Sequence, residues 1–143
     1  PAMLDAARDA AESVGGTSRP LVIAVTVLTS MDDGDLSAVG QTPPAEEQVV
    51  RLAQLTQNHG LDGVVCSPAE IEPIRAACGP EFKLIVPGIR PDWAASGDQK
   101  RITTPRQARD RGADMLVIGR PITGADDPAA AAARIAEELG VSA

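Results

Sequence analysis

The stretch "LVIGRPIT" (residues 116–123) joins a short apolar run to a glycine, an arginine and a proline. A second stretch, "LIVPGIRP" (residues 84–91), has a similar order: an apolar run, then Pro-Gly, then an arginine. Continuous apolar runs rich in β-branched residues are typical of strands that are covered on both faces of a parallel sheet. A glycine at a strand end exposes backbone N–H groups, and an arginine beside it adds a fork of donors suited to an anion. The two stretches therefore predict a parallel α/β fold with an anion-binding edge.

Helical and strand patterns alternate along the whole chain, which predicts right-handed βαβ units in one domain spanning residues 1–143. The loops that follow the strands are long and polar, and function in such sheets lies at the carboxyl ends of the strands. The polar segment 30–44 is interpreted as a loop with at most one helical turn. Strands are predicted at residues 21–29, 62–67, 81–88 and 114–119, and helices at residues 1–14, 44–59, 68–78, 104–111 and 128–139.

The composition excludes several function classes. The chain has 13 Lys and Arg against 20 Asp and Glu, a formal charge of −7, which argues against broad nucleic-acid or membrane-surface binding. Cys66 and Cys78 form neither a zinc pattern nor a disulfide framework, so reduced, buried thiols in a cytoplasmic protein are expected. No apolar run approaches the roughly 18 residues of a membrane span. The start, "PAMLDAARDAAESVG", is amphipathic and acidic, unlike a signal peptide, and resembles the interior of a longer chain.

Arg90 and Arg120 follow two successive predicted strands, and each lies close to a glycine. In (β/α)₈ barrels a phosphate commonly binds beside the loops after the last two strands. The two guanidinium groups could therefore converge on one dianion, with Gln99 from the intervening loop. The alternative is that both arginines are surface residues that pair with some of the 20 acids.

Five stretches, "IAVTVLTSM", "LDGVVCSPAE", "FKLIVPGIRP", "GDQKRITTP" and "MLVIGRPIT", together resemble the orotidine 5′-monophosphate decarboxylase family in its bacterial form. The resemblance extends from residue 1 to about residue 139. It implies that the chain is the C-terminal half of a (β/α)₈ barrel that works as a cytoplasmic homodimer without cofactor or metal. The implied reaction converts orotidine monophosphate to uridine monophosphate and carbon dioxide, the last step of de novo pyrimidine synthesis.

The resemblance also implies roles for individual residues. Arg90 and the Arg120 side chain correspond to phosphate ligands, and Gly119 corresponds to a backbone phosphate ligand. Gln99 corresponds to a residue of the lid that bridges phosphate and base.

Contacts to the pyrimidine are implied for a second group of residues. Thr29 corresponds to a strand-end residue that hydrogen-bonds the base, with the neighbouring Ser30 as the second candidate. Pro87 corresponds to part of the apolar wall around the base.

The family's catalytic Asp-x-Lys-x-x-Asp segment is absent from these 143 residues. Asp98 and Lys100 have part of the spacing, but Thr103 stands where the second acid belongs. We therefore expect no catalytic residue in this chain and no turnover by the chain alone. A four-stranded half-barrel also leaves two unpaired edges, so it is not expected to persist as a monomer.

Two alternatives to this decarboxylase remain open at the sequence level. One is a non-catalytic phosphate-binding half-barrel. The other is a different decarboxylase or aldolase of the ribulose-phosphate-binding barrel superfamily.

Several polar or aromatic residues have a structural interpretation. His59 is expected to interact with a helix dipole, and Ser67 lacks the partners of a nucleophile. Asp32, Asp33 and Asp35 are expected to form a solvated loop rather than a metal site. Trp93 either covers the closed site or packs against the barrel rim.

Overall fold

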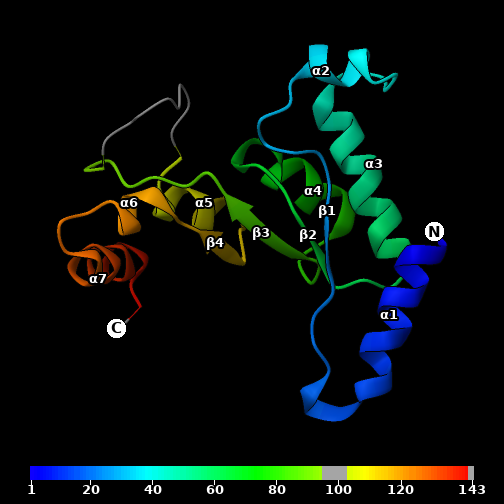
Figure 1. Ribbon diagram of the computed structural model, residues 1–143, viewed down its shortest axis with the longest axis horizontal. Coiled ribbons are helices and arrows are strands. Elements are labelled where there is room, and N and C mark those ends of the chain that lie inside the picture. Colours follow the sequence, from blue (N-terminus) through cyan, green and yellow to red (C-terminus); the bar gives the residue numbers. More distant parts are fainter. Residues whose placement is uncertain (95–102, 142–143) are drawn as a thin grey trace.

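The computed structural model describes residues 1–94 and 103–141. Its centre is one sheet of four parallel strands in the order β1-β2-β3-β4 (Figure 1). Sequential strands are neighbours, which is the commonest arrangement of consecutive βαβ units. The strands are β1 (Ile23–Val25), β2 (Gly63–Val65), β3 (Lys83–Pro87) and β4 (Met115–Val117).

Helices separate the strands, which confirms the predicted α/β alternation. Two short 3₁₀ turns, η1 (Gly16–Ser18) and η2 (Pro68–Glu70), accompany them. The helices are α1 (Ala2–Val14), α2 (Asp33–Ala38), α3 (Ala45–Asn58), α4 (Ile71–Cys78), α5 (Pro105–Arg111), α6 (Arg120–Thr123) and α7 (Pro128–Leu139).

Four expectations are corrected. The strand predicted at residues 21–29 is only Ile23–Val25, because the Thr26 hydroxyl donates to the Val65 carbonyl at 2.9 Å where the β1–β2 ladder ends. The predicted loop 30–44 contains α2, and Arg120 starts the short α6 instead of lying in a loop. The outer strands β1 and β4 are also not covered on both faces, because Val25 and Met115 are exposed.

The core lies between the sheet and helices α3, α4 and α5. Val64 and Leu84, which are register partners on β2 and β3, are fully buried there with Ile71 and Ile74 of α4. Strand side chains alternate between faces, so Val65 and Ile85 point to the opposite side and are only half-buried. Packing of the helices on this face holds the strands in place. It thereby also fixes the positions of the residues at the carboxyl ends of the strands.

Within residues 1–94 and 103–141, no helix combines the length and the apolar character needed to cross a membrane.

Candidate anion-binding edge of the sheet

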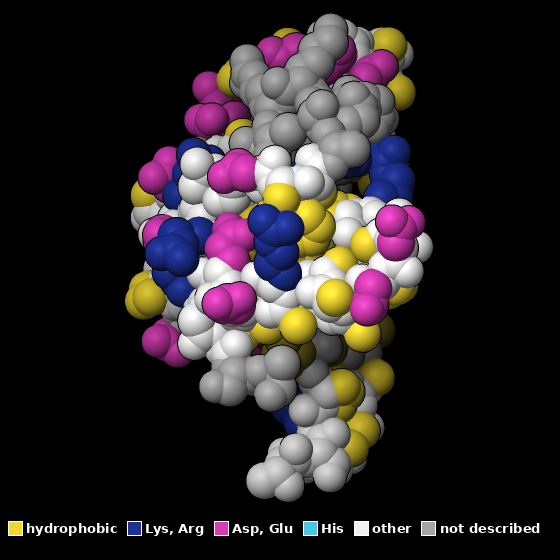
Figure 2. Space-filling view, turned by 90° about the vertical axis from the view of Figure 1, so that its left-hand side faces the viewer, with side chains coloured by type: hydrophobic (Ala, Val, Ile, Leu, Met, Phe, Trp, Pro, Cys, Tyr) yellow, Lys and Arg dark blue, Asp and Glu magenta, His cyan; other side chains and the backbone are white. Residues whose placement is uncertain are grey.

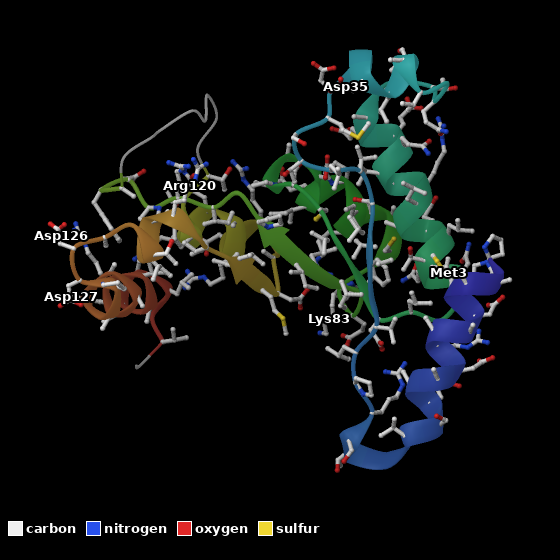
Figure 3. All side chains as sticks on the ribbon, viewed as in Figure 1. Met3, Asp35, Lys83, Arg120, Asp126 and Asp127 are labelled. Atoms are coloured by element: carbon white, nitrogen blue, oxygen red, sulfur yellow. The ribbon has the colours of Figure 1, made fainter. Side chains whose placement is uncertain are left out.

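The described residues predicted to bind a ligand all lie at the carboxyl edge of the sheet. Thr29 and Ser30 form an exposed turn after β1, and Pro87 is the last residue of β3. Gly119 precedes α6, and Arg120 begins it. Figure 3 shows Arg120 at this edge of the sheet, whereas Lys83, the first residue of β3, lies at the opposite edge. Gln99 lies outside the described residues.

The two arginines leave adjacent strands in matching positions. Val86 pairs with Leu116 and Pro87 with Val117. Arg90 and Arg120 each follow this last register pair by three residues along their own segment. Arg90 is buried, with 6% of its surface exposed, while Arg120 is exposed. The two predicted phosphate ligands therefore come from neighbouring strand exits, and Arg120 is the more accessible of the two.

The exit of β3 is held in a defined conformation. Gly88 has φ +78°, a left-handed value that favours glycine, and it turns the chain so that Ile89 returns to the core. Ile89 forms a parallel bridge with Thr103, and the Arg90 N–H donates to the Thr103 carbonyl at 3.0 Å. The backbone of Arg90 is thus fixed by its hydrogen bond to Thr103.

The exit of β4 is open. A Cβ atom added at Gly119 would meet no atom within 4 Å, so packing within the described chain does not require glycine there. A bare backbone beside an exposed guanidinium leaves room for a ligand to approach closely. This arrangement fits the anion site that the sequence predicts.

The pyrimidine candidates are not adjacent to one another. Thr29 and Ser30 follow β1, whereas Pro87 ends β3, and β2 lies between these two strands. A ligand that contacts all three residues would have to extend across the carboxyl end of β2.

Cys66 and Ser67 follow β2 at the same edge, but neither is arranged as a nucleophile. Burial, together with the nearby Glu70 carboxylate, raises the pKa of the Cys66 thiol to about 12, so it stays protonated. Ser67 forms a capping box with Glu70, whose Oε2 accepts the Ser67 N–H at 2.7 Å. Cys66 and Cys78 are both free and buried, as predicted.

The acids at 32, 33 and 35 are helix caps. Asp32 and Asp35 form a reciprocal capping box at the start of α2, and Asp33 Oδ1 accepts the Ala45 N–H of α3 at 2.7 Å. In the described part of the chain, no group of three or more His, Cys, Asp or Glu residues could hold a metal ion.

Two residues have partners that sequence reasoning did not find. His59 ends α3, and its Nδ1 lies 2.6 Å from Asp5 Oδ1 of α1; this hydrogen bond lowers the pKa of the Asp5 carboxyl. The Trp93 ring contacts α7, where the Arg134 guanidinium lies 4.6 Å from the centre of the ring. No regular spacing in the sequence links either pair, since each joins segments far apart in the chain.

Comparisons with known proteins identify a family that matches most of the chain. The model of the orotidine 5′-phosphate decarboxylase / HUMPS family matches residues 1–135. The orotidine 5′-phosphate decarboxylase of Paramagnetospirillum magneticum is 57% identical over 140 residues, which are 98% of this chain and 59% of that protein. The Rhodospirillum rubrum protein of the same name is 55% identical over 96% of this chain and 57% of its own length.

The fold comparison gives the same result. A crystal structure of the orotidine 5′-phosphate decarboxylase from Lactobacillus acidophilus matches with a TM-score of 0.81 and 37% identity, over 97% of this chain and 58% of that chain. The predicted fold class is thereby confirmed: the four parallel strands and their helices are part of a (β/α)₈ barrel. The chain spans less than two thirds of the length of these relatives.

Proposed function

The chain belongs to the orotidine 5′-phosphate decarboxylase / HUMPS family, and from that premise we propose that it supplies the phosphate and pyrimidine contacts of such a decarboxylase. The proposed reaction of the whole protein converts orotidine 5′-monophosphate to uridine 5′-monophosphate and carbon dioxide, in de novo pyrimidine synthesis. The observation that carries the proposal is the matched pair of arginines at the exits of β3 and β4.

We assign the phosphate to the exit of β4. Arg120 offers an exposed guanidinium, which is always charged and can donate two parallel hydrogen bonds to a phosphate. Gly119 leaves the backbone open on the same side. Arg90 contributes positive charge from the adjacent exit, and Gln99 is proposed to bridge phosphate and base.

The base is assigned to the other strand exits. The hydroxyl of Thr29, or that of Ser30, is proposed to hydrogen-bond the pyrimidine, and both residues are exposed to a ligand. Pro87 is half-buried at the end of β3 and is proposed to form part of the apolar wall.

The bond-breaking step is assigned to residues outside this chain. When the carbon–carboxylate bond breaks, its electron pair stays on the ring carbon, which needs a proton from a nearby acid such as a lysine. Of the two lysines in the sequence, Lys83 lies at the amino end of β3, 3.4 Å from Asp114, and Lys100 lies outside the described residues. Lys83 is therefore at the wrong edge of the sheet, and the 143 residues alone are proposed to be inactive.

Two further features are proposed on the resemblance alone. They are a homodimeric assembly and a cytoplasmic location. The free, buried Cys66 and Cys78 are consistent with a reducing compartment.

A titration with uridine monophosphate tests the proposal. We expect the protein, expressed at the full length that its gene encodes, to release heat on binding the nucleotide and to decarboxylate orotidine monophosphate. Arg120→Ala should weaken nucleotide binding about 10- to 100-fold, since a hydrogen bond to a charged group contributes about 1.5–3 kcal/mol. Arg51→Ala is the matched control, because Arg51 is an exposed arginine that pairs with Glu47 on α3.

The outcomes separate the alternatives. Nucleotide binding without decarboxylation by the full-length protein would favour the non-catalytic phosphate-binding barrel. Equal binding by the wild type and Arg120→Ala would contradict the assigned phosphate site.

A further inference from the structure

Trp93 and Arg134 form a contact that the assigned site does not use. The Arg134 guanidinium lies 4.6 Å from the centre of the Trp93 ring, within the roughly 6 Å range of a cation–π interaction. Trp93 belongs to the segment that follows β3, and Arg134 belongs to α7, so the contact joins two elements 41 positions apart in the chain.

On the Trp93 side, the contact is close to Arg90. Pro91 is fully buried, and the Ala94 N–H donates to the Pro91 carbonyl at 3.0 Å, which closes a tight turn around Trp93. Arg90 is the residue directly before this turn. An interaction that restrains the Trp93 ring, such as its contact with Arg134, therefore also restrains the backbone at Arg90.

On the Arg134 side, the contact reaches the support of Arg120. Helix α7 packs against α6, which begins with Arg120, and also against α5 (Figure 1). Ala131 and Ile135 are the buried residues of α7. Glu138 Oε1 of α7 accepts the Arg106 N–H of α5 at 3.1 Å. Helix α7 therefore supports the exit of β4 through α6, and it contacts the segment after β3 through Trp93.

The surface around the contact carries charges of both signs, so charge alone would not give Arg134 one specific partner. Figure 2 looks onto the end of the molecule where α6 and α7 lie, and its Lys and Arg side chains are interspersed with Asp and Glu. Trp93 and Arg134 line a surface hollow together with Arg106, Glu137 and Glu138. The flat indole ring adds a specific, directional partner for Arg134 among these charges.

We propose that Trp93 and Arg134 are positioning residues that set the spacing between Arg90 and Arg120, and so determine how well the site holds a phosphate. This inference rests on the proposed function, because it takes the two arginines as the phosphate ligands. In this proposal Trp93 and Arg134 act through the two arginines and do not bind the phosphate.

Calorimetric titration of the full-length protein tests the inference, with uridine monophosphate and uridine as the two probes. We expect Trp93→Ala and Arg134→Met each to weaken uridine monophosphate binding about three- to tenfold, a range typical for loss of one partly exposed cation–π contact. Uridine lacks the phosphate, so its affinity should stay within about twofold of the wild type. The ratio of the two affinities therefore reports the phosphate site and does not move when stability alone is lost.

Conservative variants sharpen the test. Trp93→Phe keeps an aromatic face and should retain most of the phosphate preference, whereas Trp93→Leu should not. The double variant Trp93→Ala/Arg134→Met should bind no more weakly than either single variant, since both remove the same contact.

The failures of the two proposals are distinguishable. If Arg120→Ala weakens uridine monophosphate binding as expected and Trp93→Ala leaves it unchanged, the positioning role alone is overturned. Equal loss of uridine and uridine monophosphate binding in Trp93→Ala would also overturn it, because the effect would not concern the phosphate. A wild-type protein that binds no uridine monophosphate would overturn both proposals.

Discussion

Two aspartates set the register at the amino edge of the sheet, and they do so in the same way. Asp62 directly precedes β2, and its Oδ2 accepts the Val22 N–H at 2.7 Å. Asp114 directly precedes β4, and its Oδ2 accepts the Leu84 N–H at 2.9 Å. Each carboxylate also pairs with one arginine. The partners are Arg19 for Asp62 and Arg75 for Asp114.

Removing the charge of Asp114 should destabilise the protein at neutral pH. Burial raises the pKa of this carboxyl, but the Leu84 N–H and the Arg75 guanidinium outweigh burial and leave the pKa below its ordinary value of 3.8. Because hydrogen bonds to a charged group contribute about 1.5–3 kcal/mol, Asp114→Asn should lower the free energy of unfolding at pH 7 by about that amount. Urea unfolding measures this change.

The same variant should alter the pH dependence of stability. A lowered pKa means that the contribution of Asp114 is present above pH 3.8 and is lost as the pH falls through the folded-state value. The difference between the wild type and Asp114→Asn should therefore shrink between pH 5 and pH 2. A constant difference over that range would contradict the assignment.

Short side-chain caps define the starts of the helices. Thr104 and Gln107 form a reciprocal capping box at α5, as Asp32 and Asp35 do at α2. At α7 the cap is Asp127, whose Oδ1 accepts the Ala130 N–H at 3.0 Å. Each cap satisfies a backbone N–H that has no partner within its own helix.

The cap of α7 offers a matched pair of substitutions. Asp126 and Asp127 are adjacent and exposed near the start of α7 (Figure 3), but only Asp127 accepts a helix N–H. We expect Asp127→Ala to lower the free energy of unfolding by about 1 kcal/mol. Asp126→Ala should change it by less than about 0.5 kcal/mol, as a surface substitution does. Chemical denaturation of both variants measures the difference, and equal losses would contradict the capping role.

Elements with local signals could be predicted from the sequence. Thr104 before Pro105 and Asp127 before Pro128 marked the starts of α5 and α7, and both helices begin there. The end of β1 could not be predicted, because it depends on Thr26 meeting Val65 from another strand. Helix α2 has a local signal that the interpretation as a solvated loop missed, because the acids at 32 and 35 have the spacing of a capping box.

In the candidate site, the positions of the two arginines along the chain could be predicted, but their burial and contacts could not. A glycine and an arginine after each of two apolar runs placed Arg90 and Arg120 at strand exits, and the structure has both there. The burial of Arg90 was not predictable, because it depends on the bridge between Ile89 and Thr103. The contact of Trp93 with Arg134 depends on how α7 returns to the sheet, which no local pattern reports.

One face of the sheet carries an apolar row that the described helices do not cover. Val25, Val65, Ile85 and Met115 are successive register partners across the four strands. Register partners in a parallel sheet point to the same face. The two ends of the row are the most open, with Val25 61% and Met115 53% exposed.

Apolar hollows lie beside both outer strands. One of about 510 Å³ is lined by residues of α1, β1 and α3, including Leu4, Val22 and Leu52. Another of about 410 Å³ lies between β4 and α7 and includes Leu116 and Ile135. In the described residues β1 pairs only with β2, and β4 only with β3, so both outer strands keep a free edge. A free edge next to exposed apolar side chains favours association with another chain.

The 143-residue chain on its own should therefore self-associate. We expect sedimentation equilibrium at micromolar concentration to give a mass well above the 14.7 kDa of one chain. The double variant Val25→Lys/Met115→Lys should shift the mass toward a single chain, because it places two charges at the ends of the apolar row. Val39→Lys is the control, since Val39 is 64% exposed at the end of α2 and lines neither of the two hollows. Both substituted strand positions are exposed, so far-UV circular dichroism should show unchanged helix content. A wild-type chain that sediments as a 14.7 kDa monomer at every concentration would contradict the prediction that the free strand edges and the apolar row drive self-association.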